Sequence, residues 1–439
     1  MTGGHKSRAV PVPSGRFNRL ARIGGLGAGV AGRMAMGGAW QLGQGKRPDV
    51  RGLLLTPKNI TRVTEQLAQM RGAAMKIGQL VSMDTGDVLP PELAQIMARL
   101  RDDAHRMPPA QLKRVLTENW PRGWLGQFAQ FDVHPIAAAS IGQVHRGQLK
   151  DGRDLAIKVQ YPGVAGSIDS DVINVGALIR MSGLLPKGFE LAPYLEQARQ
   201  QLHEETDYAL EGRHLVRFGQ LLSNDPAFDV PALQSDWTTD NILAMSFVSG
   251  APIETAADAP QHTRDHIARS LIALTLRELF EWGVMQSDPN FANYRWNADS
   301  GRIVLLDFGA TREISPHVAG RYRELMRAGL AGDMARAETV ADEIGFLSSA
   351  ISSDHRIRIM GMMEIVFDAL RMPGPFDFVA TDLPRRMQAE GEALARSGFV
   401  PPPVPIDVLY LQRKFGGMFL LASKLRARVD VRGLMNAHL

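Results

Sequence analysis

MQSDPNFANYRW, residues 285 to 296, carries two polar side chains at a spacing that suits phosphate chemistry. Asp288 and Asn293 stand five positions apart, and Asp307 follows Asn293 by fourteen residues, directly after the apolar run IVLL (303–306). Amide and carboxylate oxygens are the ligands that Mg²⁺ prefers, and Mg²⁺ commonly bridges phosphate groups. The pattern therefore predicts a Mg²⁺ site with Asn293 and Asp307 as metal ligands.

The order of these residues is more informative than any one of them. Taken singly, Asp288 could begin an Asp-Pro turn, Asn293 could be a loop residue, and the DFG triplet (307–309) could be a chance match. Together they have the spacing of the catalytic loop and the metal-binding segment of phosphoryl-transfer enzymes. In that interpretation Asp288 orients the attacking hydroxyl or water.

Upstream, AAASIGQV (137–144) aligns with the loop G-x-G-x-x-G-x-V that covers phosphates in kinases. Alanine stands at the first two glycine positions, where it restricts the backbone and adds methyl groups. Alone, the stretch is better explained as an Ala-rich strand turn. With the downstream residues it predicts a nucleotide loop of altered preference. The expected loop residues are Ala137, Ala138, Ala139, Ser140, Gly142 and Val144.

Fourteen residues after Val144, Lys158 ends the apolar run LAIK. Burial of an unpaired ammonium is costly, so this lysine is either an edge-strand residue that points to water or the partner of a carboxylate and of nucleotide phosphates. The segment HEETDYALEGRH (203–214) supplies carboxylates. Glu204, Asp207 and Glu211 are three and four residues apart, so they could line one stripe of a helix, although such a stripe is usually a solvated face.

The periodicity of the apolar residues changes along the chain. Spacings of three and four predict helices from Thr56 to Val81, from Pro91, and over 107–116. The segment 131–163 has short Ile- and Val-rich runs joined by Asp151-Gly152, a hairpin-turn signal, and predicts about three strands. The other expected elements are helices over 167–184 and 190–222, strands over 230–233, 241–250 and 303–309, and a helix from Pro316.

Six motifs resemble those of the UbiB/AarF family of atypical protein-kinase-like proteins. They are MKIGQ (75–79), AAASIGQVH (137–145), AIKVQYPGV (156–164), EETDYALEG (204–212), QSDPNFANY (286–294) and LLDFGA (305–310). The QSDPNFANY version is closer to the subgroup that acts in coenzyme Q biosynthesis in mitochondria and their bacterial relatives. The position before Asp288 is Ser287, where ordinary kinases have His-Arg, and the family tolerates this departure.

The resemblance implies an α+β fold of the two-lobed protein-kinase type, with an N-terminal helical extension whose K-x-G-Q helix folds over the active site. It implies that Glu211 pairs with Lys158, which is then catalytic together with Asp288. Met245 to Val248 are expected to form the adenine hinge. The implied regulatory residues are Lys76 and Gln79 of the K-x-G-Q signature, and Glu205 and Asp207 of an E-x-D signature.

The expected domain order follows from the same elements. We expect a basic, glycine-rich arm (1–50), a helical K-x-G-Q extension (51–125), a kinase-like N-lobe with the Ala-rich loop (126–250) and a helical C-lobe with the catalytic loop and DFG (251–439). A nucleotide site is expected in the cleft between the lobes.

The arm has no acidic residue before Asp49 and contains the apolar run IGGLGAGVAGRMAMGGAW (23–40). Arg33 interrupts this run, so it is a poor secretory signal and a marginal membrane span. A flexible leader, an interfacial arm drawn to anionic lipid, and a transit peptide all remain open. Because the chain lacks the pair of C-terminal transmembrane helices of many bacterial family members, we expect peripheral attachment to the cytoplasmic face of the inner membrane, or to the matrix side in a eukaryote.

The composition excludes several kinds of site. The chain has no cysteine among its 439 residues, which excludes disulfides, thiol catalysis and cysteine-ligated metals. Its net charge of +4 is small for this length, so we expect no nucleic-acid partner. The glycine-rich run 24–38 permits helix–helix packing and leaves a homodimer open.

The function expected from the resemblance is that of an ATP/ADP- and Mg²⁺-binding ATPase or phosphotransferase that supports ubiquinone (coenzyme Q) biosynthesis at a membrane. Only ATREIS (310–315) separates the DFG from the next expected helix, and no A-P-E triplet follows, so the usual platform for a peptide substrate is missing. The expected partners are a nucleotide, a lipid or quinone intermediate, an anionic membrane surface and quinone-biosynthesis proteins. A protein or small-molecule kinase, and a nucleotide-gated lipid-binding scaffold with little turnover, are the alternatives.

Overall fold

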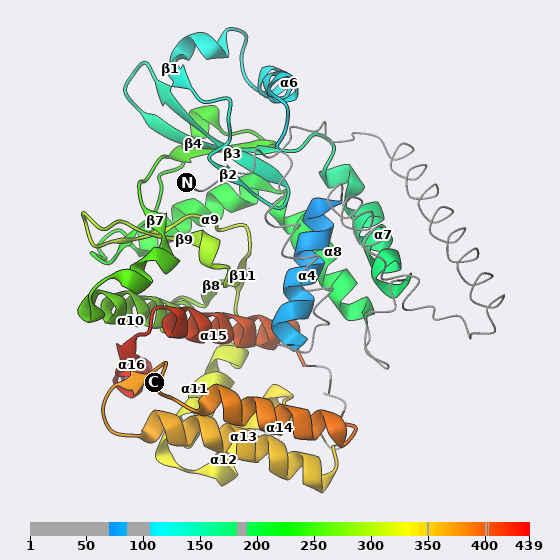
Figure 1. Cartoon of the computed structure of the whole chain (residues 1–439), viewed down its shortest axis with the longest axis vertical. Helices are drawn as coiled ribbons and strands as arrows, with labels where there is room; N and C mark the ends of the chain where they lie inside the picture. The colour runs from blue at the N-terminus through cyan, green and yellow to red at the C-terminus, as the bar shows by residue number, and fades with distance from the viewer. Residues whose placement is uncertain (1–69, 86–105, 182–190, 349–350, 400–401, 403) are drawn as a thin grey trace, which may run out of the picture. The chain divides into compact units, whose positions relative to one another are not determined.

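The computed structural model describes residues 70–85, 106–181, 191–348, 351–399, 402 and 404–439 (Figure 1). The chain divides into two compact units. Residues up to Val216 and Ala232–Phe247 belong to the first, and Arg217–Pro231 and Val248–Leu439 belong to the second. The basic arm 1–50 and the helix expected from Pro91 lie outside the described residues.

An antiparallel sheet forms the centre of the first unit. Its strands run in the order β1-β3-β4-β6, and β2 pairs with β3. The bounds are β1 Phe128–Phe131, β2 Ala137–Ala138, β3 Gly142–Leu149, β4 Asp154–Gln160 and β6 Ile242–Ser246. Gly152 has a φ of 93°, a conformation that glycine adopts without strain, and it closes the β3–β4 hairpin. The strands expected in 131–163 and the turn at Asp151-Gly152 are therefore confirmed.

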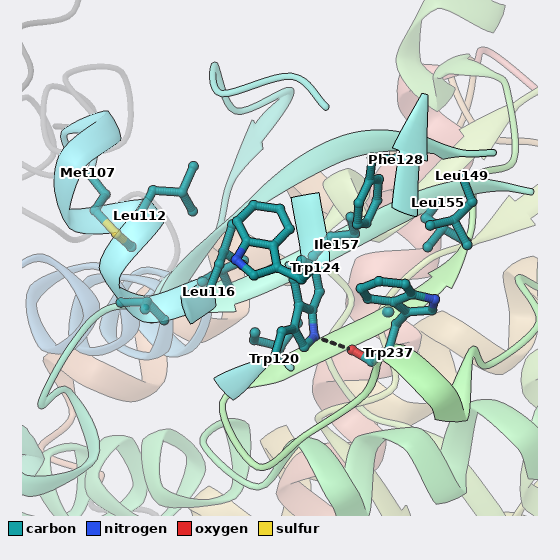
Figure 2. Close-up of a cluster of buried hydrophobic side chains, with 14 of the residues drawn as sticks. Met107, Leu112, Leu116, Trp120, Trp124, Phe128, Leu149, Leu155, Ile157 and Trp237 are labelled. Carbon is teal, nitrogen blue, oxygen red and sulfur yellow. Dashed lines mark hydrogen bonds between the residues drawn. The ribbon is translucent and has the colours of Figure 1, made fainter. Parts of the chain in front are cut away.

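Aromatic side chains pack the sheet against helix α6 (Pro109–Asn119) (Figure 2). Trp120, at the end of α6, contacts Trp237 edge to face with ring centroids 4.9 Å apart, and its indole N–H donates to the Trp237 carbonyl oxygen at 3.0 Å. Leu116 and Ile157 are fully buried in the same cluster. The helix expected over 107–116 is confirmed, and its apolar side closes one face of the sheet.

Four further helices belong to this part of the chain: α4 (Arg71–Thr85), α7 (Ile168–Met181), α8 (Ala192–Glu205) and α9 (Tyr208–Leu221). Helix α4 packs against α7 and α8. The single helix predicted over 190–222 is wrong, because the chain breaks at Thr206-Asp207. Asp207 Oδ1 accepts the Leu210 N–H at 2.7 Å, as a helix-capping side chain does, and a new helix begins there.

The second unit contains short strands and many helices. One sheet has the order β5-β10-β9-β7, and β8 pairs with β11 in another. The strand bounds are β5 Phe228–Asp229, β7 Ala251–Pro252, β8 Val284–Gln286, β9 Tyr294–Trp296, β10 Ile303–Leu305, β11 Thr311–Glu313, β12 Phe376–Asp377 and β13 Arg428–Val429. The strand predicted over 230–233 is misplaced, since the sheet uses Phe228–Asp229 and Leu233 forms only an isolated bridge with Met245. The strands predicted over 241–250 and 303–309 are shorter than expected.

The helices of this unit are α10 (Gln261–Arg277), α11 (Pro316–Ala331), α12 (Met334–Ile344), α13 (Ser353–Arg371), α14 (Leu383–Arg396), α15 (Ile406–Lys424) and α16 (Val431–His438). Helix α10 continues into a π-helical turn, Glu278–Trp282. The helix expected from Pro316 is confirmed, and Ser315 caps it by accepting the Val318 N–H at 3.2 Å. In the described parts of the chain, no helix is both long and apolar enough to cross a membrane.

The aromatic cluster predicts how the first unit responds to truncation. Trp120→Ala removes a buried ring and its hydrogen bond, so we expect a loss of about 3–5 kcal/mol of unfolding free energy. The measurement is urea-induced unfolding followed by far-UV circular dichroism. Leu125, 53% exposed, is the matched control, and Leu125→Ala should change the free energy by less than about 0.5 kcal/mol. Equal midpoints for the two variants would contradict the packing role of Trp120.

Candidate active site

Lys158 and Glu211 form a buried ion pair in the first unit. Lys158 lies on β4, and its Nζ is 2.8 and 2.9 Å from the two carboxylate oxygens of Glu211 on α9. The lysine is 7% exposed and the glutamate 2%. The structure thus brings together the two residues that the sequence paired. The alternative of an edge-strand lysine that points to water is wrong, because β3 and β6 flank β4 on both sides.

A buried Lys–Glu pair contributes little net stability to a fold. Desolvation of two charges offsets most of their attraction, and apolar residues of similar volume are often as stable. A buried Lys–Glu pair on a central strand is therefore better explained by a need for a fixed positive charge than by a contribution to folding.

The Ala-rich segment forms a closed turn between β2 and β3. Ala137 pairs with Val144, and the Ala139 N–H donates to the Gly142 carbonyl oxygen at 2.9 Å. A Cβ on Gly142 would lie 2.4 Å from the Val159 carbonyl oxygen, so this glycine allows the close approach of β3 to β4. The third glycine position of the motif therefore has a structural reason that does not involve a nucleotide.

Glu205 joins the Ala-rich turn to helix α4. Its carboxylate lies 2.7 Å from Lys76 Nζ and accepts a short hydrogen bond from Ser140 Oγ. A Cβ on Gly72 of α4 would lie 2.7 Å from the Ser140 carbonyl oxygen, which shows how closely the helix and the turn approach. The structure thus brings Lys76 and Glu205 together.

Glu204, Asp207 and Glu211 do not line one stripe of a single helix, because the helix break separates Glu204 from Glu211. Asp207 caps α9, whereas Glu211 faces Lys158 one turn further along. Gln79 lies on α4, one turn beyond Lys76. Its side chain lies outside the described residues.

In the second unit, β8 leads into the segment that contains Asp288. Asp288 is half-buried, and its Oδ1 accepts the Asn290 N–H at 3.2 Å. The Asn293 amide nitrogen donates to the Asp288 carbonyl oxygen at 3.4 Å. Residues 287–293, which we call the catalytic loop, are therefore held by their own side chains. Ser287 replaces the arginine of ordinary kinases, and its N–H and Oγ both donate to the Ala310 carbonyl oxygen, at 3.0 and 2.7 Å.

The DFG segment is attached to the same loop. The Leu306 N–H donates to the Asn293 carbonyl oxygen at 3.0 Å, and Asp307 Oδ1 accepts the Gly309 N–H at 3.0 Å. Phe308 is 1% exposed and stands 4.9 Å from the Phe218 ring. Asn293 and Asp307 line one small cavity. One amide and one carboxylate on neighbouring segments fit the oxygen preference of Mg²⁺.

A buried polar cluster lies at the base of the catalytic loop, and the sequence reasoning missed it. Lys414 on α15 is 1% exposed, and its Nζ lies 2.8 Å from the Gln286 carbonyl oxygen, 3.1 Å from the Tyr294 hydroxyl and 3.4 Å from a Glu278 carboxylate oxygen. Burial lowers the pKa of Lys414, but Glu278 and Tyr294 together raise it by more, so the pKa lies above its ordinary value. The signal available in the sequence was a lysine inside the apolar stretch 408–422.

The predicted adenine hinge, Met245 to Val248, contains the point where the chain passes from the first unit to the second. Met245 is buried on β6 opposite Ala156, whereas Val248 is the first residue of the longer segment of the second unit.

Residues 99–341 match the family described as the ABC1 atypical kinase-like domain. The chain belongs to this family. It is 36% identical to the atypical kinase COQ8, mitochondrial, of Saccharomyces cerevisiae over 95% of this chain and 83% of the relative. It is 37% identical to the atypical kinase COQ8B, mitochondrial, of Rattus norvegicus over 98% of this chain and 81% of that one. The resemblance of the six motifs to the UbiB/AarF family and its coenzyme Q subgroup is therefore confirmed.

A solved structure, the complex of Rv3197 with erythromycin from Mycobacterium tuberculosis, resembles this chain with a TM-score of 0.60. The match covers 85% of this chain and 93% of the other at 21% identity, so it supports the fold alone. The α+β, kinase-like fold expected from the sequence is confirmed. The chain is an atypical kinase-like enzyme.

The buried pair predicts that stability and nucleotide binding respond differently to substitution. Lys158→Met removes the lysine from a buried Lys–Glu pair and should cost about 3–5 kcal/mol, whereas Lys158→Met with Glu211→Leu should recover most of that loss. Both variants should lose ATP affinity, because neither retains the ammonium. The measurements are thermal unfolding and isothermal titration with ATP and Mg²⁺. If the double variant binds ATP like the wild type, Lys158 does not contact the phosphates.

Proposed function

We propose that this chain is a Mg²⁺-dependent, ATP-binding enzyme that supports coenzyme Q biosynthesis. The observation that carries the nucleotide part of the proposal is the buried Lys158–Glu211 pair on a central strand. Membership of the ABC1 family and the names of the COQ8 relatives support the coenzyme Q part.

Each polar residue has a proposed role. Lys158, held by Glu211, neutralises the charge of the α- and β-phosphates. Asp288 orients the attacking water or hydroxyl, and its hydrogen bond from the Asn290 N–H fixes the carboxylate. Asn293 and Asp307 hold Mg²⁺, which when bound neutralises phosphate charge. Met245 to Val248 would receive the adenine, and residues 137–144 would bind the phosphates.

The contact of α4 with the Ala-rich turn supports a regulatory role for Lys76, Gln79, Glu205 and Asp207. Lys76 and Ser140 share the Glu205 carboxylate. A movement of α4 would therefore also change the contacts of the Ala-rich turn. We propose that this connection restrains the Ala-rich loop and thereby reduces the transfer of phosphoryl groups onto protein substrates.

The short segment after the DFG favours a substrate that is not a peptide. Six residues, Ala310 to Ser315, separate Gly309 from α11, and β11 within them pairs with β8. A segment of this length that is already paired offers little backbone for a peptide to bind. ATP hydrolysis coupled to a lipid or quinone intermediate therefore fits better than a general protein kinase.

The proposed setting is the surface of the inner membrane, on the cytoplasmic side in a bacterium or the matrix side in a mitochondrion. The curated relatives named COQ8 and COQ8B are mitochondrial by name. Anionic lipid and other quinone-biosynthesis proteins are the proposed partners, and a homodimer is compatible with the glycine-rich run 24–38.

The metal assignment predicts a specific loss in Asp307→Asn. The substitution preserves shape but removes a charged ligand, so ATP affinity in Mg²⁺ should fall at least about 10-fold, whereas affinity in EDTA should change little. Isothermal titration measures both. Asp299, exposed in a loop, is the control, and Asp299→Asn should bind like the wild type. A normal Mg²⁺ dependence in Asp307→Asn would contradict the assignment.

The cellular role predicts the outcome of a rescue experiment. In a strain that lacks its own COQ8-type gene, the wild-type chain should restore coenzyme Q and remove accumulated intermediates, measured by mass spectrometry. Asp288→Asn should leave quinone near the level of the empty vector, because the attacking group is no longer oriented. Full rescue by Asp288→Asn, at equal protein level, would favour a scaffold without turnover.

A further inference from the structure

Helix α15, drawn in red in Figure 1, lies outside the matched family region 99–341, yet its Lys414 contacts the residues that flank the catalytic loop. Lys414 is 1% exposed. A buried ammonium is costly unless it is paired and hydrogen-bonded. The partners of Lys414 therefore indicate the role of this lysine.

The contacts of Lys414 fall at both ends of the catalytic loop. Its Nζ lies 2.8 Å from the carbonyl oxygen of Gln286, which precedes the loop, and 3.1 Å from the hydroxyl of Tyr294, which follows it. Glu278 completes the arrangement, since its Oε1 accepts the Gln286 N–H at 3.2 Å and its Oε2 lies 3.4 Å from Lys414. The peptide groups on both sides of the Gln286 Cα are thus held by one ion pair.

A second contact between α15 and the loop does not involve charge. Gly417 lies one turn beyond Lys414, and a Cβ at this position would lie 2.1 Å from Pro289 Cβ. Pro289 is buried and follows Asp288 directly. The helix therefore approaches the loop so closely that a methyl group at residue 417 would displace it.

We propose that α15 positions the catalytic loop: Lys414 binds the Gln286 carbonyl oxygen at one end of the loop and the Tyr294 hydroxyl at the other, and Gly417 allows the helix to approach Pro289 closely. Lys414 is a positioning residue in this scheme, since it touches neither the nucleotide nor the reacting atoms. The inference rests on the proposed function, in which Asp288 and Asn293 act on Mg²⁺-ATP.

If Lys414 positions the loop, loss of the Lys414–Glu278 pair should lower turnover more than it lowers nucleotide affinity. Loss of the Lys414–Glu278 link frees the loop that carries Asp288 and Asn293, whereas Lys158 and Asp307 lie outside that loop. A small misplacement of a catalytic group can lower turnover by about 10²-fold. A purely structural ion pair would instead lower the unfolding midpoint and leave the turnover of the folded protein unchanged.

The first test is Lys414→Met combined with Glu278→Gln in the full chain. The double variant removes the ionic link without leaving an unpaired charge, so it should fold even where Lys414→Met alone does not. We expect kcat for ATP hydrolysis to fall about 10- to 100-fold and KM for ATP to change by a smaller factor, because Lys158 and Asp307 lie outside the loop. The matched control is Lys424→Met, which removes an exposed lysine from the end of the same helix and should keep the wild-type kcat.

The second test uses two neighbouring glycines. Gly417→Ala should lower kcat because the added methyl group would meet Pro289. In Gly416→Ala the methyl group has open space around it, so this variant should keep the wild-type kcat. Hydrogen exchange of the peptide that covers 284–296 provides a readout without activity. Its protection should fall in Gly417→Ala and in the Lys414 double variant, but not in the two controls.

The outcomes separate this inference from the proposed function. Wild-type kcat and wild-type exchange in the folded Lys414 double variant, in a protein whose activity Asp288→Asn abolishes, would overturn the positioning role alone. Equal ATP hydrolysis by the wild type and Asp288→Asn would overturn the proposed function, and the exchange experiment would then still report whether α15 holds the loop.

Discussion

The ion pair between Lys158 and Glu211 is the constraint on which the first unit depends. A charged lysine on a central strand requires a carboxylate within hydrogen-bond distance, and that requirement fixes the position of α9 against β4. The helix break at Thr206-Asp207 is part of the same arrangement, because it frees α9 to present Glu211 to the sheet while Glu205 on α8 turns to Lys76. One short acidic segment thereby supplies the partners of both Lys158 and the helix that carries the K-x-G-Q motif.

The second unit uses a related device. Lys414 and Glu278 form a buried pair beneath the catalytic loop, and their contacts reach the backbone of Gln286. Neither pair is a strong source of stability, since desolvation offsets most of the Coulomb attraction. The two pairs act mainly by fixing positions: Glu211 holds the charge of Lys158, and Lys414 with Glu278 holds the backbone of Gln286. This kind of fixed electrostatic environment is what phosphoryl transfer requires of a protein, which contributes mainly positioning and charge.

Much of this could be predicted from the sequence, and the reasons for the rest are physical. The order Lys158, Asp288, Asn293, Asp307 is specific to one chemistry, so it indicated the fold before any element was located. The Glu211 pairing needed the E-x-D resemblance, since spacing alone favoured a common carboxylate stripe. Strands of two or three residues, such as β8 and β9, are too short to show a period. Lys414 belongs to no motif, and its partners Gln286 and Tyr294 are 128 and 120 positions away in the chain, so only the tertiary structure reveals these contacts.

The most direct test of the central claim is a paired measurement with γ-labelled ATP on the purified full chain. The account predicts Mg²⁺-dependent release of labelled inorganic phosphate that exceeds label on protein, and loss of both signals in Asp288→Asn. Label on a protein acceptor in excess of free phosphate would identify a protein kinase. Phosphate release that is equal in the wild type and Asp288→Asn would contradict the assignment of this site as the one that turns over ATP.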